Sequence, residues 1–342
     1  MKHVTIVGAT GAVGAELLAI LADRGVDASR LRLFASSRSA GRRVDHPGGS
    51  IVVESADETA LRDAFAWSDV VYLAANGRVS RRLAPIAVAA SCTVIDHSSA
   101  FRGDPGCPLV VCGVNDEVLD GFEGPGVIAN PNCSTIIALA AIAPLRRLGR
   151  LVRLTVCTYQ VISGAGAEAM VELEAQARAW ASGHALPTTR LGRQGIFNVF
   201  NHDSEVDPAG VNLEERKLEI ESRRILAQPE LRVSSTCVRV PVMRAHSEAI
   251  HVEFDGPVDP TEARTILSEA PGLELVDAPE DRRFPEPIHA TGRDDVLVGR
   301  IRRDPGVPDG RGLALFAVGD QLRKGAALNA VQIAEAIESR GR

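Results

Sequence analysis

A cysteine at residue 133 stands between a polar turn and an apolar run, a position in which a thiol can act as a nucleophile. Cys133 follows Asn130-Pro131-Asn132 and precedes apolar residues over 136–142, which are typical of a buried helix. The unpaired N–H groups and the dipole at a helix N-terminus favour an anion. A free thiol has a pKa of about 8.5, and such a position can lower it into or below the neutral range.

A glycine-rich turn near the start of the chain predicts a dinucleotide site. Gly8, Gly11 and Gly14 follow an apolar strand at 4–7 and open a helix at 15–23. In that context glycines let the backbone approach a pyrophosphate, and helix N–H groups bind it. We assign three neighbours in the turn to the same site: Thr10, Ala12 and Val13. The alternative is a tight structural turn between a strand and a helix.

The end of the second predicted strand, at 31–35, indicates which nicotinamide cofactor is bound. An NAD site usually carries Asp or Glu about twenty residues beyond the glycines, where it binds the ribose hydroxyls. This chain has Ser36, Arg38 and Ser39 there instead. Their hydroxyls and guanidinium would accept a 2′-phosphate, so we predict NADP. The alternative is a solvated basic turn.

The pattern of predicted strands and helices along the chain predicts two domains. Strands and helices alternate up to about residue 130, which is typical of a parallel, doubly wound α/β sheet. Longer strands with period-2 alternation follow, which favour a mixed or antiparallel sheet covered on one side. The strands that we predict are 31–35, 51–53, 70–74 and 93–96, then 152–160, 233–240, 249–254 and 296–303. We place a Rossmann-type domain at 1–130, completed by a C-terminal helix within 322–342, and a second domain at 131–321.

Length, composition and charge favour a globular enzyme of two domains. The 342 residues exceed one ordinary core, and 45% hydrophobic with 24% charged residues is typical of soluble proteins. The net charge of −6 and the aromatic content of 4% argue against nucleic acid or a membrane surface as a partner. We expect a cytoplasmic protein, because no signal-peptide pattern and no bilayer-spanning apolar run is present. The six cysteines have no zinc-like spacing, so we expect free thiols and no metal.

Together these residues give the chain a resemblance, from end to end, to the aspartate-semialdehyde dehydrogenases. The motifs that carry it are Gly8-Ala-Thr-Gly-Ala-Val-Gly14, Ser36-Ser-Arg-Ser-Ala-Gly41, Ser98-Ser-Ala-Phe-Arg102, Asn130-Pro-Asn-Cys-Ser-Thr135, Thr158-Tyr-Gln160, Ser163-Gly-Ala-Gly166, Cys237-Val-Arg-Val-Pro241, His246-Ser-Glu248, Gly292-Arg-Asp-Asp295, Gly299-Arg-Ile-Arg302 and Lys324-Gly-Ala-Ala-Leu-Asn-Ala-Val331.

The resemblance implies a fold, an activity and an assembly. The fold is a Rossmann domain followed by an α+β catalytic and dimerisation domain, as in glyceraldehyde-3-phosphate-dehydrogenase-like proteins. The activity is the reversible, NADPH-dependent conversion of L-aspartyl 4-phosphate to L-aspartate 4-semialdehyde and inorganic phosphate. It belongs to the biosynthesis of lysine, threonine, methionine and diaminopimelate. The assembly is a homodimer or a homotetramer.

The resemblance also implies a role for each site residue. Cys133 would be the nucleophile, His246 the acid/base and Gln160 an orienting residue. Arg239 would hold the substrate α-carboxylate and Glu214 its amino group, while Arg102 and Lys217 would bind phosphate. The remaining substrate contacts are Asn132, Ser163 and Gly164, and Gln321 joins the cofactor site.

Local patterns bear on some of these roles. Glu214 and Lys217 lie three apart on a predicted helix at 213–226 and so share one side of it. Asn212 and Glu215 have the spacing of a capping box. Arg239 alternates with apolar neighbours on its strand, so we expect it on the less apolar face.

Three positions depart from the common family pattern, and two alternatives stay open. His97 stands where Asn is usual, Asn76 replaces a small residue, and Gln321 replaces Asn; region 187–213 also matches poorly. One alternative is a related reductase of another acyl phosphate, such as N-acetylglutamyl phosphate, or of an acyl thioester. The other is a non-catalytic NADP-binding regulator. Glu214 and Arg239 favour a free amino acid as substrate, and the Cys133/His246 pair favours a catalyst.

Overall fold

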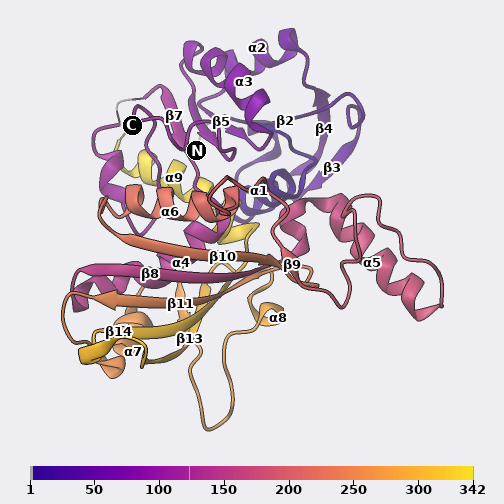
Figure 1. Cartoon of the computed structure of the whole chain (residues 1–342). Helices are drawn as coiled ribbons and strands as arrows, with labels where there is room; N and C mark the ends of the chain where they lie inside the picture. The colour runs from indigo at the N-terminus through magenta and orange to yellow at the C-terminus, as the bar shows by residue number, and fades with distance from the viewer. Residues whose placement is uncertain (1–2, 123, 342) are drawn as a thin grey trace. The chain divides into compact units, whose positions relative to one another are not determined.

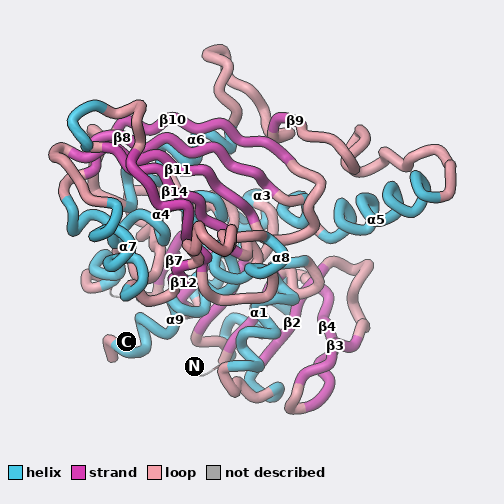
Figure 2. The backbone as a smooth tube through the Cα atoms, turned by 90° about the horizontal axis from the view of Figure 1, so that it is seen from below, coloured by secondary structure: helices cyan, strands magenta, loops and turns pink. Residues whose placement is uncertain are grey.

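The computed structural model describes residues 3–122 and 124–341. The chain divides into two compact units. One comprises Met1–Asn132 with Ala326–Arg342, and the other comprises Cys133–Gly325. Each unit combines helices with a sheet (Figure 1 and Figure 2).

The first unit contains a seven-stranded sheet with the order β3-β4-β2-β1-β5-β6-β7. Its strands are β1 (Val4–Val7), β2 (Leu31–Ala35), β3 (Arg43–His46), β4 (Gly49–Ser55), β5 (Val70–Leu73), β6 (Thr93–Asp96) and β7 (Gly126–Ala129). Neighbouring strands pair in parallel, except for the antiparallel edge pair β3 and β4. The chain runs outward from β1 in both directions, which confirms the predicted doubly wound sheet. Its switch point, where such sheets bind ligands, lies between β1 and β5.

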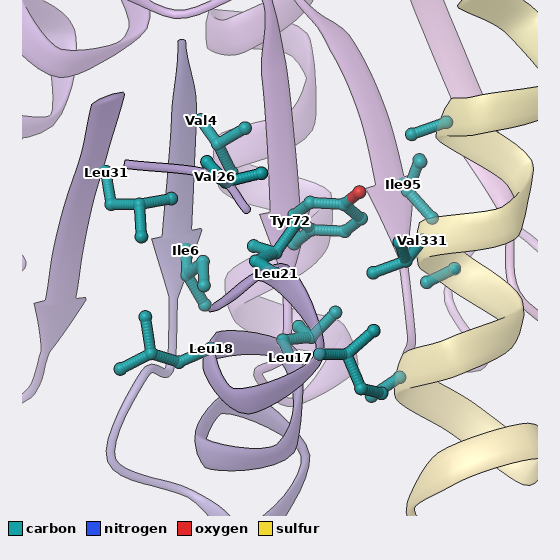
Figure 3. Close-up of a cluster of buried hydrophobic side chains, with 14 of the residues drawn as sticks. Val4, Ile6, Leu17, Leu18, Leu21, Val26, Leu31, Tyr72, Ile95 and Val331 are labelled. Carbon is teal, nitrogen blue, oxygen red and sulfur yellow. The ribbon is translucent and has the colours of Figure 1, made fainter. Parts of the chain in front are cut away.

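Helices cover both faces of this sheet. They are α1 (Ala12–Asp23), α2 (Glu58–Trp67), α3 (Gly77–Ala89) and α9 (Leu328–Ser339). Leu17 and Leu21 of α1 pack with Ile6, Tyr72 and Val331 in one core, so α1 and α9 share a face (Figure 3). Side chains of α2 and α3 form a separate core on the other face. The C-terminal helix returns to the first unit because its apolar stripe completes that unit's core.

Two glycines in the turn after β1 require the absence of a side chain. Gly8 has a φ of +91°, and a Cβ there would lie 2.2 Å from the carbonyl oxygen of Ala74. A Cβ on Gly14 would lie 2.2 Å from the carbonyl oxygen of Gly8. The turn therefore packs tightly against both β5 and α1. No side chain caps the N-terminus of α1 at Gly11, which leaves its first N–H groups suited to an anion.

The second unit is built on a mixed sheet with the order β12-β13-β14-β11-β8-β10-β9. Its strands are β8 (Leu151–Gln160), β9 (Phe200–Asn201), β10 (Arg232–Arg239), β11 (His246–Phe254), β12 (Leu273–Leu275), β13 (Val296–Arg303) and β14 (Gly312–Gly319). Its helices are α4 (Cys133–Ile142), α5 (Ala167–Ala181), α6 (Leu213–Ile225), α7 (Pro260–Glu269) and α8 (Pro287–Ala290). Figure 2 shows β10, β8, β11 and β14 side by side.

Helices α4, α6 and α7 pack on this sheet. Along β11, Ile250, Val252 and Phe254 are buried, while His251 and Glu253 are half-buried. This alternation confirms the predicted sheet covered on one side. Among the described residues, no helix is both long and apolar enough to cross a membrane.

Candidate active site

Cys133 and His246 form a close pair within the second unit. Cys133 is the first residue of α4, which confirms the predicted helix start. Its Sγ lies 3.2 Å from Nε2 of His246, a fully buried residue at the start of β11. The main-chain N–H of Val161 donates to Nδ1 of His246 at 3.1 Å. A backbone N–H is only a donor, so Nδ1 must accept, and the neutral ring carries its hydrogen on Nε2, toward the sulfur.

The environment of His246 keeps its imidazole neutral. Burial, and secondarily the positive charge of Arg239, lower the pKa of His246 to about 3. A neutral Nε2–H can donate a hydrogen bond to a thiolate, and to an oxygen that becomes anionic beside it. The pair therefore suits a nucleophilic sulfur with a fixed hydrogen-bond donor next to it.

Gln160, Glu214 and Lys217 form a hydrogen-bonded chain beside this pair. Gln160 ends β8, and its Nε2 donates to Ser134 Oγ at 3.0 Å and to Glu214 Oε1 at 3.2 Å. Lys217 Nζ donates to the other oxygen of Glu214 at 2.9 Å. The predicted capping box of Asn212 and Glu215 is present at the start of α6. It fixes the first turn of α6, on which Glu214 is almost fully buried.

Arg239 ends β10 and is 5% exposed. Nη1 donates to the carbonyl oxygen of Val161 at 3.1 Å, and Nη2 donates to His202 Nε2 at 2.9 Å. Asp203 Oδ1 lies 3.4 Å from the same Nη2. The sequence predicted Arg239 on the less apolar face of its strand, the side that also carries Ser235. Its side of β10, shared with the fully buried Cys237, faces inward, and its charge is tolerated there because acceptors surround it.

Ser163 and Gly164 lie on a turn at Ile162–Ala165 that borders the same cluster. A Cβ on Gly164 would lie 2.9 Å from Arg239 Nη1 and 3.5 Å from His246 Cε1, so this backbone approaches both side chains closely. The buried amide of Gln321 donates to Ser163 Oγ and accepts from the N–H of Ala245 at 2.9 Å. Gln321 thus braces the catalytic unit, and its role toward a cofactor stays a prediction.

Three neighbours of the site were missed from the sequence. His202 and Asp203 follow β9, in the region 187–213 that matches the family pattern poorly. The pairing of β9 with β10 brings them to Arg239. Glu248 is fully buried on β11. Burial raises the pKa of Glu248 well above its usual value, and the Ser134 hydroxyl acts in the opposite direction. The surroundings of Glu248 therefore favour the neutral form of its carboxyl group.

The predicted cofactor residues other than Gln321 lie in the first unit, where the glycine turn meets the loop after β2. Gly8 N–H donates to the Phe34 carbonyl oxygen at 2.8 Å. Thr10 Oγ1 and Ser39 Oγ are 3.3 Å apart, which joins the turn to the loop that carries Ser36 and Arg38. Arg38 in this loop is exposed, so its guanidinium is accessible to a ligand. The tight turn, the uncapped α1 N-terminus with Ala12 and Val13, and this cation fit a phosphorylated dinucleotide.

The other substrate-site predictions of the first unit occupy the loops after β6 and β7. The guanidinium of Arg102 donates to the carbonyl oxygens of Asn130 at 2.9 Å and His97 at 2.8 Å. Asn132 is buried. Burial lowers the pKa of His97 to about 3, so its ring is neutral. Asn76, the second departure, caps α3 by accepting from the N–H of Val79 at 3.1 Å.

Comparisons with known proteins find semialdehyde dehydrogenases along nearly the whole chain. The family models "Semialdehyde dehydrogenase, NAD binding domain" and "Semialdehyde dehydrogenase, dimerisation domain" match residues 3–122 and 142–324. An aspartate-semialdehyde dehydrogenase of Synechocystis sp. is 45% identical over 339 residues, which cover 99% of this chain and 98% of the relative. One from Bacillus subtilis is 40% identical, with coverage of 98% and 97%. The crystal structure of aspartate semialdehyde dehydrogenase II from Vibrio cholerae complexed with ASA has a TM-score of 0.93 and 38% identity, covering 99% of this chain and 98% of that one.

Proposed function

Since the chain belongs to the aspartate-semialdehyde dehydrogenase family, we propose that it converts L-aspartyl 4-phosphate to L-aspartate 4-semialdehyde and inorganic phosphate, using NADPH. The observation that carries the proposal is the Cys133–His246 pair at 3.2 Å, together with Arg239 and the Glu214–Lys217 pair in one unit. A free α-amino acid presents a carboxylate and an ammonium, and these residues offer one partner for each.

The nucleophile is the Cys133 thiolate at the N-terminus of α4. It attacks the acyl carbon, the C–S bond forms, the C–O bond to phosphate breaks, and phosphate leaves. The bound cofactor supplies the hydride that reduces the resulting thioester. The tetrahedral oxyanion then collapses, the C–S bond breaks, and the thiolate is regenerated with the aldehyde. The reaction takes up one proton overall, because the phosphate that leaves as PO4³⁻ is released as HPO4²⁻. His246 is the acid/base that relays this proton, and its Nε2–H stabilises the anionic oxygen by a hydrogen bond.

The substrate and cofactor contacts follow from the chemistry of the remaining residues. Arg239 binds the α-carboxylate and Glu214 binds the ammonium group, while Lys217 and Arg102 bind phosphate. Asn132, Ser163 and Gly164 shape the pocket around the reacting carbon. The cofactor pyrophosphate binds at the glycine turn, and Arg38 with Ser36 and Ser39 binds the 2′-phosphate. The second unit carries the dimerisation domain, and we propose a homodimer or a homotetramer.

One assay tests this function in the reverse direction. NADPH formation is followed from L-aspartate 4-semialdehyde and NADP⁺, with and without inorganic phosphate. We expect turnover that depends strictly on phosphate, and a Cys133→Ser variant that loses turnover but still binds NADPH. Turnover only with N-acetylglutamate semialdehyde would replace the proposed substrate, and substantial activity of the serine variant would exclude Cys133 as the nucleophile.

A further inference from the structure

We propose that His202 is a positioning residue: it orients Arg239, and through Arg239 it gives the enzyme its preference for substrates that carry an α-carboxylate. The inference deepens the proposed function and rests on it. It starts from the 2.9 Å contact between Arg239 Nη2 and His202 Nε2, on a side chain that is only 11% exposed.

The chemistry of the two groups fixes the direction of this hydrogen bond. A guanidinium has only donors, so Nε2 of His202 must be the acceptor. A neutral ring then carries its hydrogen on Nδ1, where Ser204 Oγ lies at 3.1 Å and can accept it. The main-chain N–H of Ser204 lies 3.2 Å from Nδ1 and would donate to it in the other tautomer. That N–H is uncharged and a weaker donor than the Arg239 guanidinium, so the tautomer that accepts from Arg239 is favoured. The ring is thus anchored at one nitrogen and presents a lone pair to Arg239 at the other.

A neutral partner suits an arginine that has to bind an anion. An aspartate at the same place would compensate the positive charge and compete with an incoming carboxylate. His202 orients the guanidinium and leaves its charge in place. Asp203, the nearest carboxylate to Nη2, is more distant at 3.4 Å, and its side chain is 56% exposed. Solvent therefore weakens its attraction for Arg239.

The surroundings keep His202 in the neutral form that this role requires. Four charged groups act on it: Glu214, Arg239, Asp203 and Lys217. Burial is the largest influence and lowers the pKa of His202, and the opposing charges do not reverse that direction. Protonation would set an N–H against the N–H of Arg239 and break the contact.

Two substitutions at residue 202 separate positioning from packing. His202→Leu removes the acceptor, and His202→Gln keeps an acceptor oxygen that does not titrate. We expect the leucine variant to raise the KM for L-aspartate 4-semialdehyde about tenfold with little change in kcat, because it removes a hydrogen bond to a charged group. Glutamine should restore KM to within about threefold of the wild type. His184→Leu, at an exposed histidine of the same unit, is the matched control and should change nothing.

A second substrate makes the test specific to the carboxylate. 3-Aminopropanal is the same aldehyde without the α-carboxylate, and its inhibition constant against L-aspartate 4-semialdehyde reports its affinity whether or not it is turned over. We expect that constant to be unchanged by His202→Leu. An unaltered KM in the leucine variant, equal losses for both aldehydes, or no rescue by glutamine would each overturn the inference. Absence of wild-type turnover with L-aspartate 4-semialdehyde would instead refute the proposed function.

Discussion

A single methyl group at residue 164 should weaken substrate binding without slowing the chemistry. In Gly164→Ala, the new Cβ would lie 2.9 Å from Arg239 Nη1, whereas ordinary contact begins at 3.4 Å. We expect Arg239 Nη1 to retreat by about 0.5 Å and to lose its 3.1 Å hydrogen bond to the Val161 carbonyl oxygen. A hydrogen bond from a charged donor contributes about 1.5–3 kcal/mol. At about 1.4 kcal/mol per factor of ten, KM for L-aspartate 4-semialdehyde should rise roughly 10- to 100-fold.

The same substitution leaves His246 at an ordinary distance of 3.5 Å from the new methyl group, so kcat should stay within about threefold. Initial rates over a range of semialdehyde concentrations, at saturating NADP⁺ and phosphate, separate the two constants. Gly256→Ala is the matched control, because a Cβ there meets nothing within 4 Å. A wild-type KM in the Gly164 variant, or a loss confined to kcat, would refute the placement of Arg239 as the carboxylate-binding group.

Three further predictions concern the cofactor and the stability of each unit. Arg38→Ala should weaken NADPH binding about 10- to 100-fold in a fluorescence titration and leave NADH nearly unaffected; equal losses would remove Arg38 from the 2′-phosphate site. Glu248 holds a proton in the folded state above its usual pKa of 4.5, so wild-type stability should fall with rising pH above that value, by up to about 1.4 kcal/mol per pH unit, and Glu248→Gln should not show this fall. Urea unfolding of both at pH 5 and 7 checks it, and parallel behaviour would contradict it. Asn329→Ala should cost about 2–4 kcal/mol in urea unfolding, because the buried amide of Asn329 bonds Cys112 N–H, the Val110 carbonyl and Asn130 Oδ1 at 2.8–2.9 Å; a loss under 1 kcal/mol would show that α9 is docked by other contacts.

Features encoded over a few residues could be predicted from the sequence. The start of α4 at Cys133, the glycine turn and the capping box of α6 each depend on neighbours within one or two helical turns. The alternation of strands with helices predicted the first sheet, and the period-2 alternation within half-buried strands predicted the second. The antiparallel edge strand β3 was not foreseen, since its residues are mostly polar.

Contacts between distant segments could not be predicted. His202 reaches Arg239 across 37 residues of sequence, and a two-residue strand, β9, brings them together. Such a short strand has no period to detect. Alternation along β11 places Glu248 inward, but a carboxyl group is rarely buried, and nothing in its local sequence shows that the site keeps it neutral. The side of β10 on which Arg239 lies follows from strand parity, but its burial depends on partners from distant segments, such as His202.

The two main-chain hydrogen bonds of Val161 limit the chain length of the aldehydes that the enzyme can use. Its carbonyl accepts from Arg239 and its N–H donates to His246, so one residue of main chain links Arg239, the proposed carboxylate-binding group, to His246, which faces the Cys133 sulfur. The backbone at Val161 thus fixes the distance between the two side chains, and with it the length of aldehyde that can reach both. Replacing the Val161 side chain removes neither contact, since both are made by main-chain groups. A change in preferred chain length would require the backbone that leads out of β8 to shift.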